Sequence, residues 1–141
     1  MPSDDDWLAL HRYFLQSNQM RTHYDPRLVR DRAASVDDEK WTEQWIDLSL
    51  WYGCLYVVIE GWQRLGAADP EIDGLLASQH VALLKRFRNG VFHYQRRYWD
   101  NRFSDFVVQG AESAAWARQL NAAIGRYFLE WFRSRHGVDD A

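Results

Sequence analysis

The chain has 141 residues, of which 47% are hydrophobic and 26% are charged, as is typical of one globular domain and not of a disordered or collagen-like chain. Its single cysteine, Cys54, excludes an internal disulfide and a thiolate zinc site, which need several cysteines. The net charge of −3 gives by itself no reason to expect a polyanionic partner. The acidic N-terminus is unlike a secretory signal, and the longest nearly apolar run, residues 48–59, is shorter than the roughly 20 residues of a membrane span. We therefore expect a cytoplasmic chain with no membrane partner.

The first helix is expected to begin at Ser3, whose hydroxyl caps the amide near Asp6. Its buried stripe consists of Trp7, Leu10 and Phe14. Residues 21–35 contain a proline, many charges and few large apolar side chains. This segment is predicted to be a connector with at most a short helix after Pro26.

The second helix is predicted to run from Ser35, with a capping pattern to Asp38, as far as Gly66. Its apolar side chains recur at helical spacing, at Trp41, Trp45, Leu48, Tyr52, Leu55, Ile59 and Trp62. The opposite face is apolar too, at Trp51, Cys54, Tyr56, Val57 and Val58. We therefore expect this helix to be enclosed on all sides or to face a second subunit.

The rest of the chain predicts two more long helices. Asp69 and Pro70 suit the start of a short helix, and a third long helix is expected over residues 78–94. Residues 95–105 are predicted to be a loop, and the last helix spans residues 110–136. Its inward side chains are Trp116, Leu120, Ile124, Tyr127, Phe128 and Trp131. The predicted fold is all-α: a single domain, 1–141, forming an antiparallel bundle of four long helices plus short connecting helices.

Common catalytic motifs are absent from the sequence. It contains no Glu-x-x-His pair, no His-x-x-x-His pair, no glycine-rich phosphate loop and no Gly-x-Ser-x-Gly. We therefore predict no metal site and no cofactor. Cys54 lies in an apolar stripe and is expected to be an inert core thiol.

A basic and aromatic segment is the main candidate for function. Residues 85–102 contain six basic residues and one acidic residue, a net charge of +5 in a chain whose total is −3. Cations interleaved with aromatic rings suit a phosphate backbone with unstacked bases. The candidate RNA-binding residues are Lys85, Arg86, Tyr94, Arg96, Arg97 and Arg102. The same charge also fits a solvated basic face or a salt-bridged interface.

Helix geometry constrains Arg88 and His93, which lie about 140° apart around a helix axis. They act together only if the helix ends near His93, or if the arginine of one chain works with the histidine of another. Gly90 between them is costly inside a helix, so we expect close approach by another backbone, such as a two-fold partner helix. The alternative for His93 is a capping residue or a hydrogen-bonded core histidine.

Residues 88–93, Arg-Asn-Gly-Val-Phe-His, resemble the arginine, polar residue, spacer and histidine motif of HEPN domains, the higher eukaryotes and prokaryotes nucleotide-binding family. The resemblance extends over about residues 36–136. It implies a helical homodimer with a composite, metal-independent RNase site, often in a toxin or antiviral effector. Arg88 and His93 would be the catalytic pair, and Asn89 would orient them. One branch, paired with nucleotidyltransferase antitoxins, has a tyrosine where this chain has Gln95.

The residues suit RNA cleavage by internal attack of a 2′-hydroxyl. Histidine is able to transfer the protons near neutral pH, and arginine is able to stabilise the charged phosphorane. The sequence therefore favours an endoribonuclease that acts on single-stranded RNA, with a protein antitoxin or regulatory partner as a possible companion. The alternative is a non-catalytic helical dimer that binds nucleotide, RNA or a protein partner through the same basic face.

Overall fold

The structure is a computed structural model that describes residues 1–32 and 38–136. This part of the chain forms six helices and contains no strand, so the predicted all-α class is confirmed. The helices are α1 (Asp4–Arg32), α2 (Asp38–Arg64), α3 (Pro70–Leu76), α4 (His80–Phe92), α5 (Asn101–Val107) and α6 (Ala111–Arg135). None of these helices combines the length and hydropathy that a membrane crossing requires.

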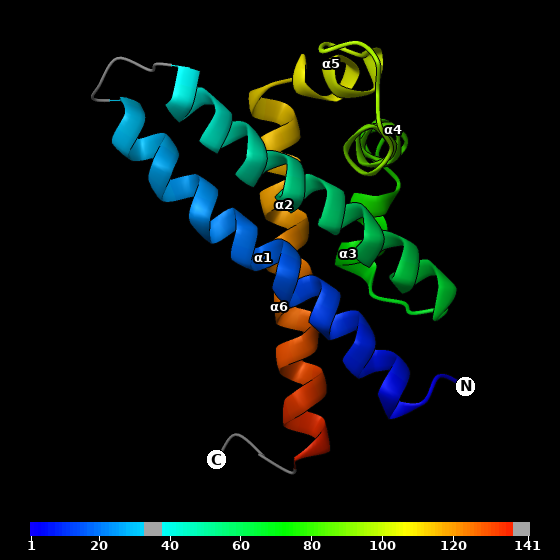
Figure 1. The fold of residues 1–141 in the computed structure, drawn as a ribbon. Coiled ribbons are helices and arrows are strands. Elements are labelled where there is room, and N and C mark those ends of the chain that lie inside the picture. Colours follow the sequence, from blue (N-terminus) through cyan, green and yellow to red (C-terminus); the bar gives the residue numbers. More distant parts are fainter. Residues whose placement is uncertain (33–37, 137–141) are drawn as a thin grey trace.

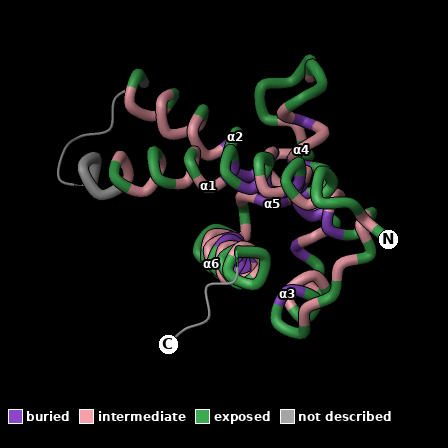
Figure 2. The backbone as a smooth tube through the Cα atoms, turned by 90° about the horizontal axis from the view of Figure 1, so that it is seen from below, coloured by how far each residue is buried: buried purple, intermediate pink, exposed green. Residues whose placement is uncertain are grey.

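Two long helices pair side by side, and the others cross them. Figure 1 shows α1 and α2 running in opposite directions, with α6 crossing behind them and α4 seen end-on beside α2. In the view of Figure 2, α6 is end-on while α1 and α2 lie across the page. The antiparallel arrangement therefore describes α1 and α2, whereas α4 and α6 lie at steep angles to this pair.

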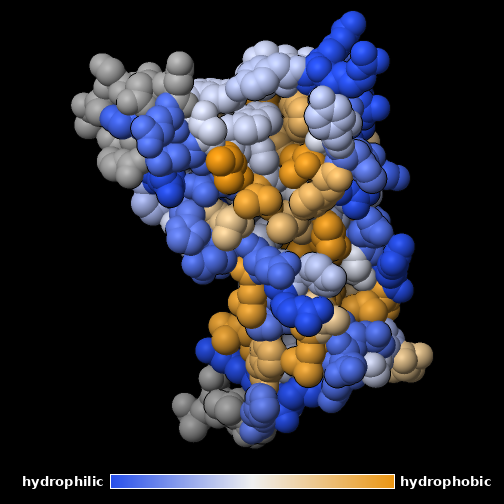
Figure 3. All heavy atoms as spheres, in the orientation of Figure 1, coloured by the Kyte–Doolittle hydropathy of each residue, from blue (hydrophilic) through white to orange (hydrophobic). Residues whose placement is uncertain are grey.

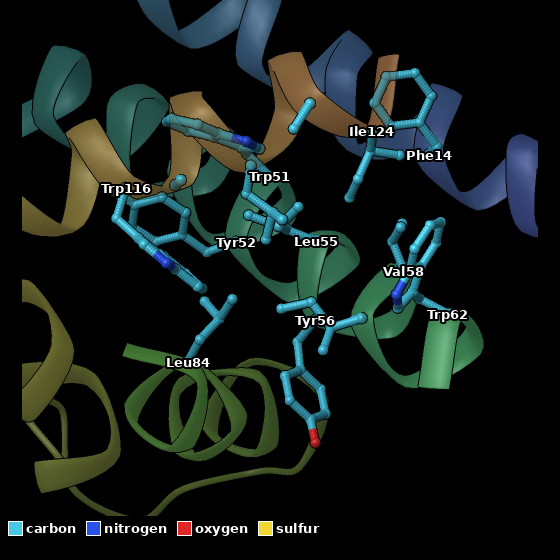
Figure 4. Packing of buried hydrophobic residues seen from close by; sticks show 14 of the residues in the cluster. Phe14, Trp51, Tyr52, Leu55, Tyr56, Val58, Trp62, Leu84, Trp116 and Ile124 are labelled. Carbon is cyan, nitrogen blue, oxygen red and sulfur yellow. The ribbon is translucent and has the colours of Figure 1, made fainter. Parts of the chain in front are cut away.

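The middle of α2 is the centre of the core. Trp51, Leu55, Val58 and Ile59 are completely buried, and α2 packs against α1, α4 and α6. Figure 4 shows side chains of α2 reaching toward α6 on one side and α4 on the other. The indole N–H of Trp51 donates a hydrogen bond to Oδ1 of Asn121 on α6 at 2.7 Å. The sequence predicted that this helix is enclosed on all sides or faces a second subunit. The middle of α2 is enclosed within the chain.

The start of α1 follows the prediction, but its second half does not. Ser3 and Asp6 form the expected reciprocal cap, in which the Ser3 amide donates to Asp6 at 2.8 Å and the Asp6 amide to Ser3 at 3.2 Å. The prediction of a connector over residues 21–35 is wrong as far as Arg32, because α1 continues through Pro26.

Ion pairs and an aromatic contact hold the second half of α1 in place. Arg27 contacts Asp47 of α2 at 2.7 Å, and Asp25 accepts from Arg118 of α6 at 2.8 Å. Tyr24 also packs against the core, with its ring 5.9 Å from that of Trp51. The Ser35 cap that the sequence suggests lies outside the described residues.

The prediction that residues 95–105 form a loop is wrong from Asn101 onward. Asp100 caps α5 by accepting a hydrogen bond from the amide of Arg102 at 2.9 Å. Phe103 and Phe106 then face the core, and Phe106 is completely buried. The other helix boundaries lie within a few residues of the predicted ones, and Gly66, with φ of 65°, follows the end of α2.

Gly90 does allow close contact, but its neighbour is the Phe103 side chain of the same chain and not the backbone of a partner. A Cβ at Gly90 would lie 2.7 Å from Cε1 of Phe103 on α5. The expected approach of a partner backbone is therefore wrong at this position. The missing side chain lets α5 pack directly against α4.

We predict that Gly90→Ala destabilises the fold by about 1–3 kcal/mol, because the added methyl group overlaps the Phe103 ring. Gly74→Ala is the matched control. Gly74 lies inside α3 with nothing within 4 Å of the added Cβ, so this change should stabilise the fold by about 0.4–1 kcal/mol. Urea denaturation of both variants measures the free energy of unfolding. Equal effects would contradict the packing of α5 on α4.

Candidate functional site

His93 stands immediately after the last residue of α4. Its backbone is extended, with φ of −123° and ψ of 131°, and its N–H donates to the carbonyl of Asn89 at 3.1 Å. The residue is exposed, so the core-histidine alternative is wrong and His93 occupies the capping position. In the described part of the chain, the imidazole has no hydrogen-bond, ion-pair or ring partner. It is therefore open to a ligand.

Arg88 is held one turn earlier on α4, and its side chain is 20% exposed. Its Nη1 lies 3.2 Å from Oε2 of Glu60 on α2, and its Nε donates to Oδ1 of Asn89 at 3.0 Å. The guanidinium also lies 4.7 Å from the ring centre of Tyr56. These contacts fix the guanidinium and use two of its five N–H donors, so three remain for an anion.

Asn89 contacts both candidate catalytic residues. Its side chain accepts from Arg88, and its carbonyl accepts from the amide of His93. Among the described residues, however, no hydrogen bond, ion pair or ring contact joins Arg88 to His93. Arg88 lies against α2 near Glu60, whereas His93 borders a pocket near Trp41. The chain therefore fixes Arg88 and places His93 at the end of α4 without bringing the two side chains together.

The pocket beside His93 has a volume of about 410 Å³ and lies between the start of α2 and the segment that joins α4 to α5. We call it the aromatic pocket. Its lining includes Trp41, Trp45, His93, Arg97, Tyr98 and Trp99. It therefore combines aromatic rings with an exposed histidine and an exposed arginine.

The basic segment divides into paired and unpaired residues. Three arginines contact carboxylates: Arg86 with Asp105 at 2.6 Å, Arg88 with Glu60 at 3.2 Å, and Arg102 with Asp100 at 3.0 Å. The pKa of Asp100 is lowered by the hydrogen bonds from the Arg102 amide and side chain. The other three cations have no carboxylate partner among the side chains that the structure describes, namely Lys85, Arg96 and Arg97. The salt-bridged interface, one of the alternatives that the sequence allowed, therefore describes three of the six cations in residues 85–102.

Figure 3 shows hydrophilic atoms gathered over the corner between α4 and α5, and hydrophobic atoms over α1 and α2. Four exposed apolar side chains of α1, α2 and α4 form what we call the apolar patch: Leu15 (50% exposed), Ile46 (51%), Leu50 (36%) and Phe92 (49%). Leu15 and Leu50 line one groove with Cys54. The Phe92 ring lies over Gly53, where a Cβ would be 3.1 Å away, one turn from Leu50. The patch therefore extends to α4, on which Arg88 lies one turn before Phe92.

Two features of this site were not predicted from the sequence. Glu60 is the single charged residue between positions 48 and 63, and this isolation within an apolar helix was the available signal. The sequence places Trp41 and Trp45 in the core stripe of α2; Trp45 does pack against the core, and both residues also line the aromatic pocket. Because the N-terminal end of α2 extends beyond the core, the same helical spacing continues onto a partly exposed surface.

Cys54 is less buried than expected. It is partly exposed in the groove with Leu15, and burial raises the pKa of its thiol. A thiol with a raised pKa forms little thiolate at neutral pH, so the inert assignment suits its chemistry.

The described residues contain no group of three or more His, Cys, Asp and Glu side chains placed to hold a metal ion. None of the protein-family models, curated proteins and solved structures compared with the chain matches it. The function is therefore inferred from the site's own residues.

Proposed function

We propose that this chain is a metal-independent endoribonuclease of the HEPN type, which cleaves single-stranded RNA in the cytoplasm as part of a toxin or antiviral-defence system. The observation that carries the proposal is the end of α4. There Arg88, with three free N–H donors, is followed in the same motif by the exposed His93. Asn89 accepts from Arg88 with its side chain and from the His93 amide with its backbone carbonyl. This arrangement supplies a proton-transfer group and a fixed cation.

The chemistry is an internal transfer on one phosphate. The 2′-hydroxyl oxygen forms a bond to phosphorus as His93 takes its proton, and the bond from phosphorus to the 5′-oxygen breaks as that oxygen gains a proton. Two copies of His93 in a dimer would divide these two transfers. The free donors of Arg88 stabilise the negative charge on the phosphorane. The products carry 2′,3′-cyclic phosphate and 5′-hydroxyl ends.

A homodimer supplies what one protomer lacks. Arg88 contacts Glu60 while His93 borders the aromatic pocket, so a composite site needs the histidine of a second copy near Arg88. The apolar patch supports this arrangement, because its four exposed side chains end at Phe92, one turn from Arg88. Burying such a patch against a second copy favours association and brings two motifs together.

The second candidate function is a non-catalytic helical dimer that binds nucleotide, RNA or a protein partner on the same surface. The ion pair between Arg88 and Glu60 favours this candidate, because it already satisfies part of the arginine's charge. A protein antitoxin or regulatory partner would have the exposed motif and the unpaired cations as its contact surface.

We expect the purified chain to be a dimer at micromolar concentration, as measured by light scattering after gel filtration. The double variant Leu15→Lys/Leu50→Lys should shift it to a monomer, because two charges cannot be buried in the apolar patch without a large cost. Val108→Lys is the control, since Val108 is 81% exposed outside the patch. A monomeric wild-type chain would contradict the composite site.

Salt dependence should separate the paired arginines from the unpaired ones. We predict that Arg96→Gln/Arg97→Gln lowers the slope of log binding constant against log salt concentration by about 1.4, as for the loss of two phosphate contacts on a single strand. Arg86→Gln/Arg102→Gln should change the slope less, because both arginines are paired with carboxylates. Fluorescence anisotropy with a 2′-deoxy oligonucleotide measures both slopes. Identical changes would place the interface elsewhere.

Cleavage should depend on both motif residues. We predict that His93→Ala and Arg88→Ala each lower the cleavage rate of single-stranded RNA by on the order of 100-fold, while binding and dimerisation persist. His23→Ala and Arg133→Ala are matched controls, because both residues are exposed and distant in sequence from the motif.

Activity should persist in EDTA, and a 2′-deoxy substitution at the cleavage site should abolish it by removing the nucleophile. Gel analysis of end-labelled products measures the rate and identifies the 2′,3′-cyclic phosphate. If the wild-type dimer cuts no RNA, or if His93→Ala cuts as fast as the wild type, the binding module replaces the enzyme as the proposed function.

A further inference from the structure

We infer that the aromatic pocket binds one unpaired nucleobase of a single-stranded nucleic acid, with Arg97 on its phosphate; as the substrate subsite beside His93, it rests on the proposed function. The RNA-binding residues predicted from the sequence were mainly cations. The aromatic pocket gives a defined place to the other part of that prediction, in which aromatic rings hold a base that has left its stack.

Three tryptophans form the inner wall of the pocket. The rings of Trp41 and Trp45 are nearly parallel, with an interplanar angle of 4° and centroids 5.8 Å apart. Trp99 stands edge-on to both, at 5.8 Å from Trp41 and 5.4 Å from Trp45. Trp45 also packs edge-on against Phe103 of α5 at 5.4 Å. The wall is therefore formed before any ligand arrives, which reduces the ordering cost of binding.

The outer side of the pocket exposes aromatic rings to water. Tyr98 is 74% exposed, Tyr94 is 92% exposed and Trp99 is 51% exposed. Tyr98 still contacts Trp41 at 6.2 Å and Trp99 at 5.7 Å, so it borders the inner wall and keeps much of its surface free. Exposed ring faces next to cations are typical of surfaces on which bases stack.

The polar groups around the pocket suit the backbone of a nucleic acid. Arg97 lines it and has no carboxylate partner among the described side chains, and the imidazole of His93 is exposed at its edge. Gln95 holds the segment between α4 and α5 in place. Its Nε2 donates to the His93 carbonyl at 2.9 Å, and its Oε1 accepts from Arg102 at 2.9 Å. A base stacked on the aromatic rings of this pocket would place its phosphate next to Arg97 and His93.

The volume of the aromatic pocket and the charge beside it indicate which kind of ligand it binds. A volume of about 410 Å³ lies in the range of small-ligand pockets, roughly 300–1,000 Å³, which suits one nucleotide and excludes a duplex. The unpaired cations Arg96 and Arg97 favour an anionic chain over a neutral peptide. Bases in a duplex do not expose their faces, so the occupant belongs to a single strand.

The test uses a hexamer of deoxyadenosine, which keeps bases and phosphates but lacks the 2′-hydroxyl and is therefore not cut. We expect binding by the wild-type chain, with quenching of tryptophan fluorescence. A hexamer of abasic sites should bind at least about fivefold more weakly, because it keeps only the phosphates. Tyr98→Ala and Arg97→Gln should each weaken binding of the deoxyadenosine hexamer by about fivefold or more, whereas Tyr98→Phe should restore the wild-type affinity.

Tyr13→Ala and Arg133→Gln are the matched controls, because they remove an exposed ring and an exposed cation outside the aromatic pocket. Trp99→Phe should keep binding but reduce the quenching. Equal affinity for the abasic hexamer, or equal effects of Tyr98→Ala and Tyr13→Ala, would overturn the inference, as would a stronger interaction with a neutral peptide than with the hexamer.

The outcomes separate this inference from the proposed function. Base-dependent binding to a chain that cuts no RNA would retain the pocket and contradict the enzyme. Cleavage with an unchanged KM in Tyr98→Ala would retain the enzyme and contradict the pocket. Thermal unfolding of each variant shows whether a loss of binding comes from loss of the fold.

Discussion

The other helices have to enclose the middle of α2, because its side chains are apolar on every face. Trp51, Leu55 and Ile59 are completely buried, and three other helices must pack around α2 to remove them from water. Figure 4 shows side chains of α2 reaching toward α6 on one side and toward α4 on the other. The candidate site lies at this crossing, because Arg88 of α4 contacts Glu60 of α2 and His93 borders the pocket that Trp41 of α2 lines.

The two ends of α2 then take different roles at the site. Toward its C-terminal end, Glu60 and Tyr56 hold the guanidinium of Arg88 in a fixed direction. Toward its N-terminal end, Trp45 packs against the core, and both Trp41 and Trp45 line the pocket beside His93. One helix therefore holds Arg88 and lines the aromatic pocket. The same aromatic spacing stabilises the core in the middle of α2 and lines a pocket at its end.

Most of the helices were predictable because their apolar side chains recur every three or four residues over a long stretch. The second half of α1 was not, since Arg27 and Asp25 stabilise it through ion pairs with α2 and α6, and hydrophobic spacing does not report such contacts. The short α5 was missed because Phe103 and Phe106 alone carry its buried face. Within the site, the motif at Arg88 and His93 was recognisable, but the contact with Glu60 depends on how α4 crosses α2, which a single sequence does not specify.

The packing at Gly90 shows which parts of the site one chain builds by itself. Phe103 fills the space that a side chain would occupy, so α5 is fixed against α4, and the segment between them is held at both ends. Gln95 ties that segment to His93 and Arg102. All the residues that line the aromatic pocket come from one chain, whereas Arg88 and His93 do not converge within it. The proposed chemistry therefore needs a second copy and the proposed base binding does not, so the two proposals are separable by experiment.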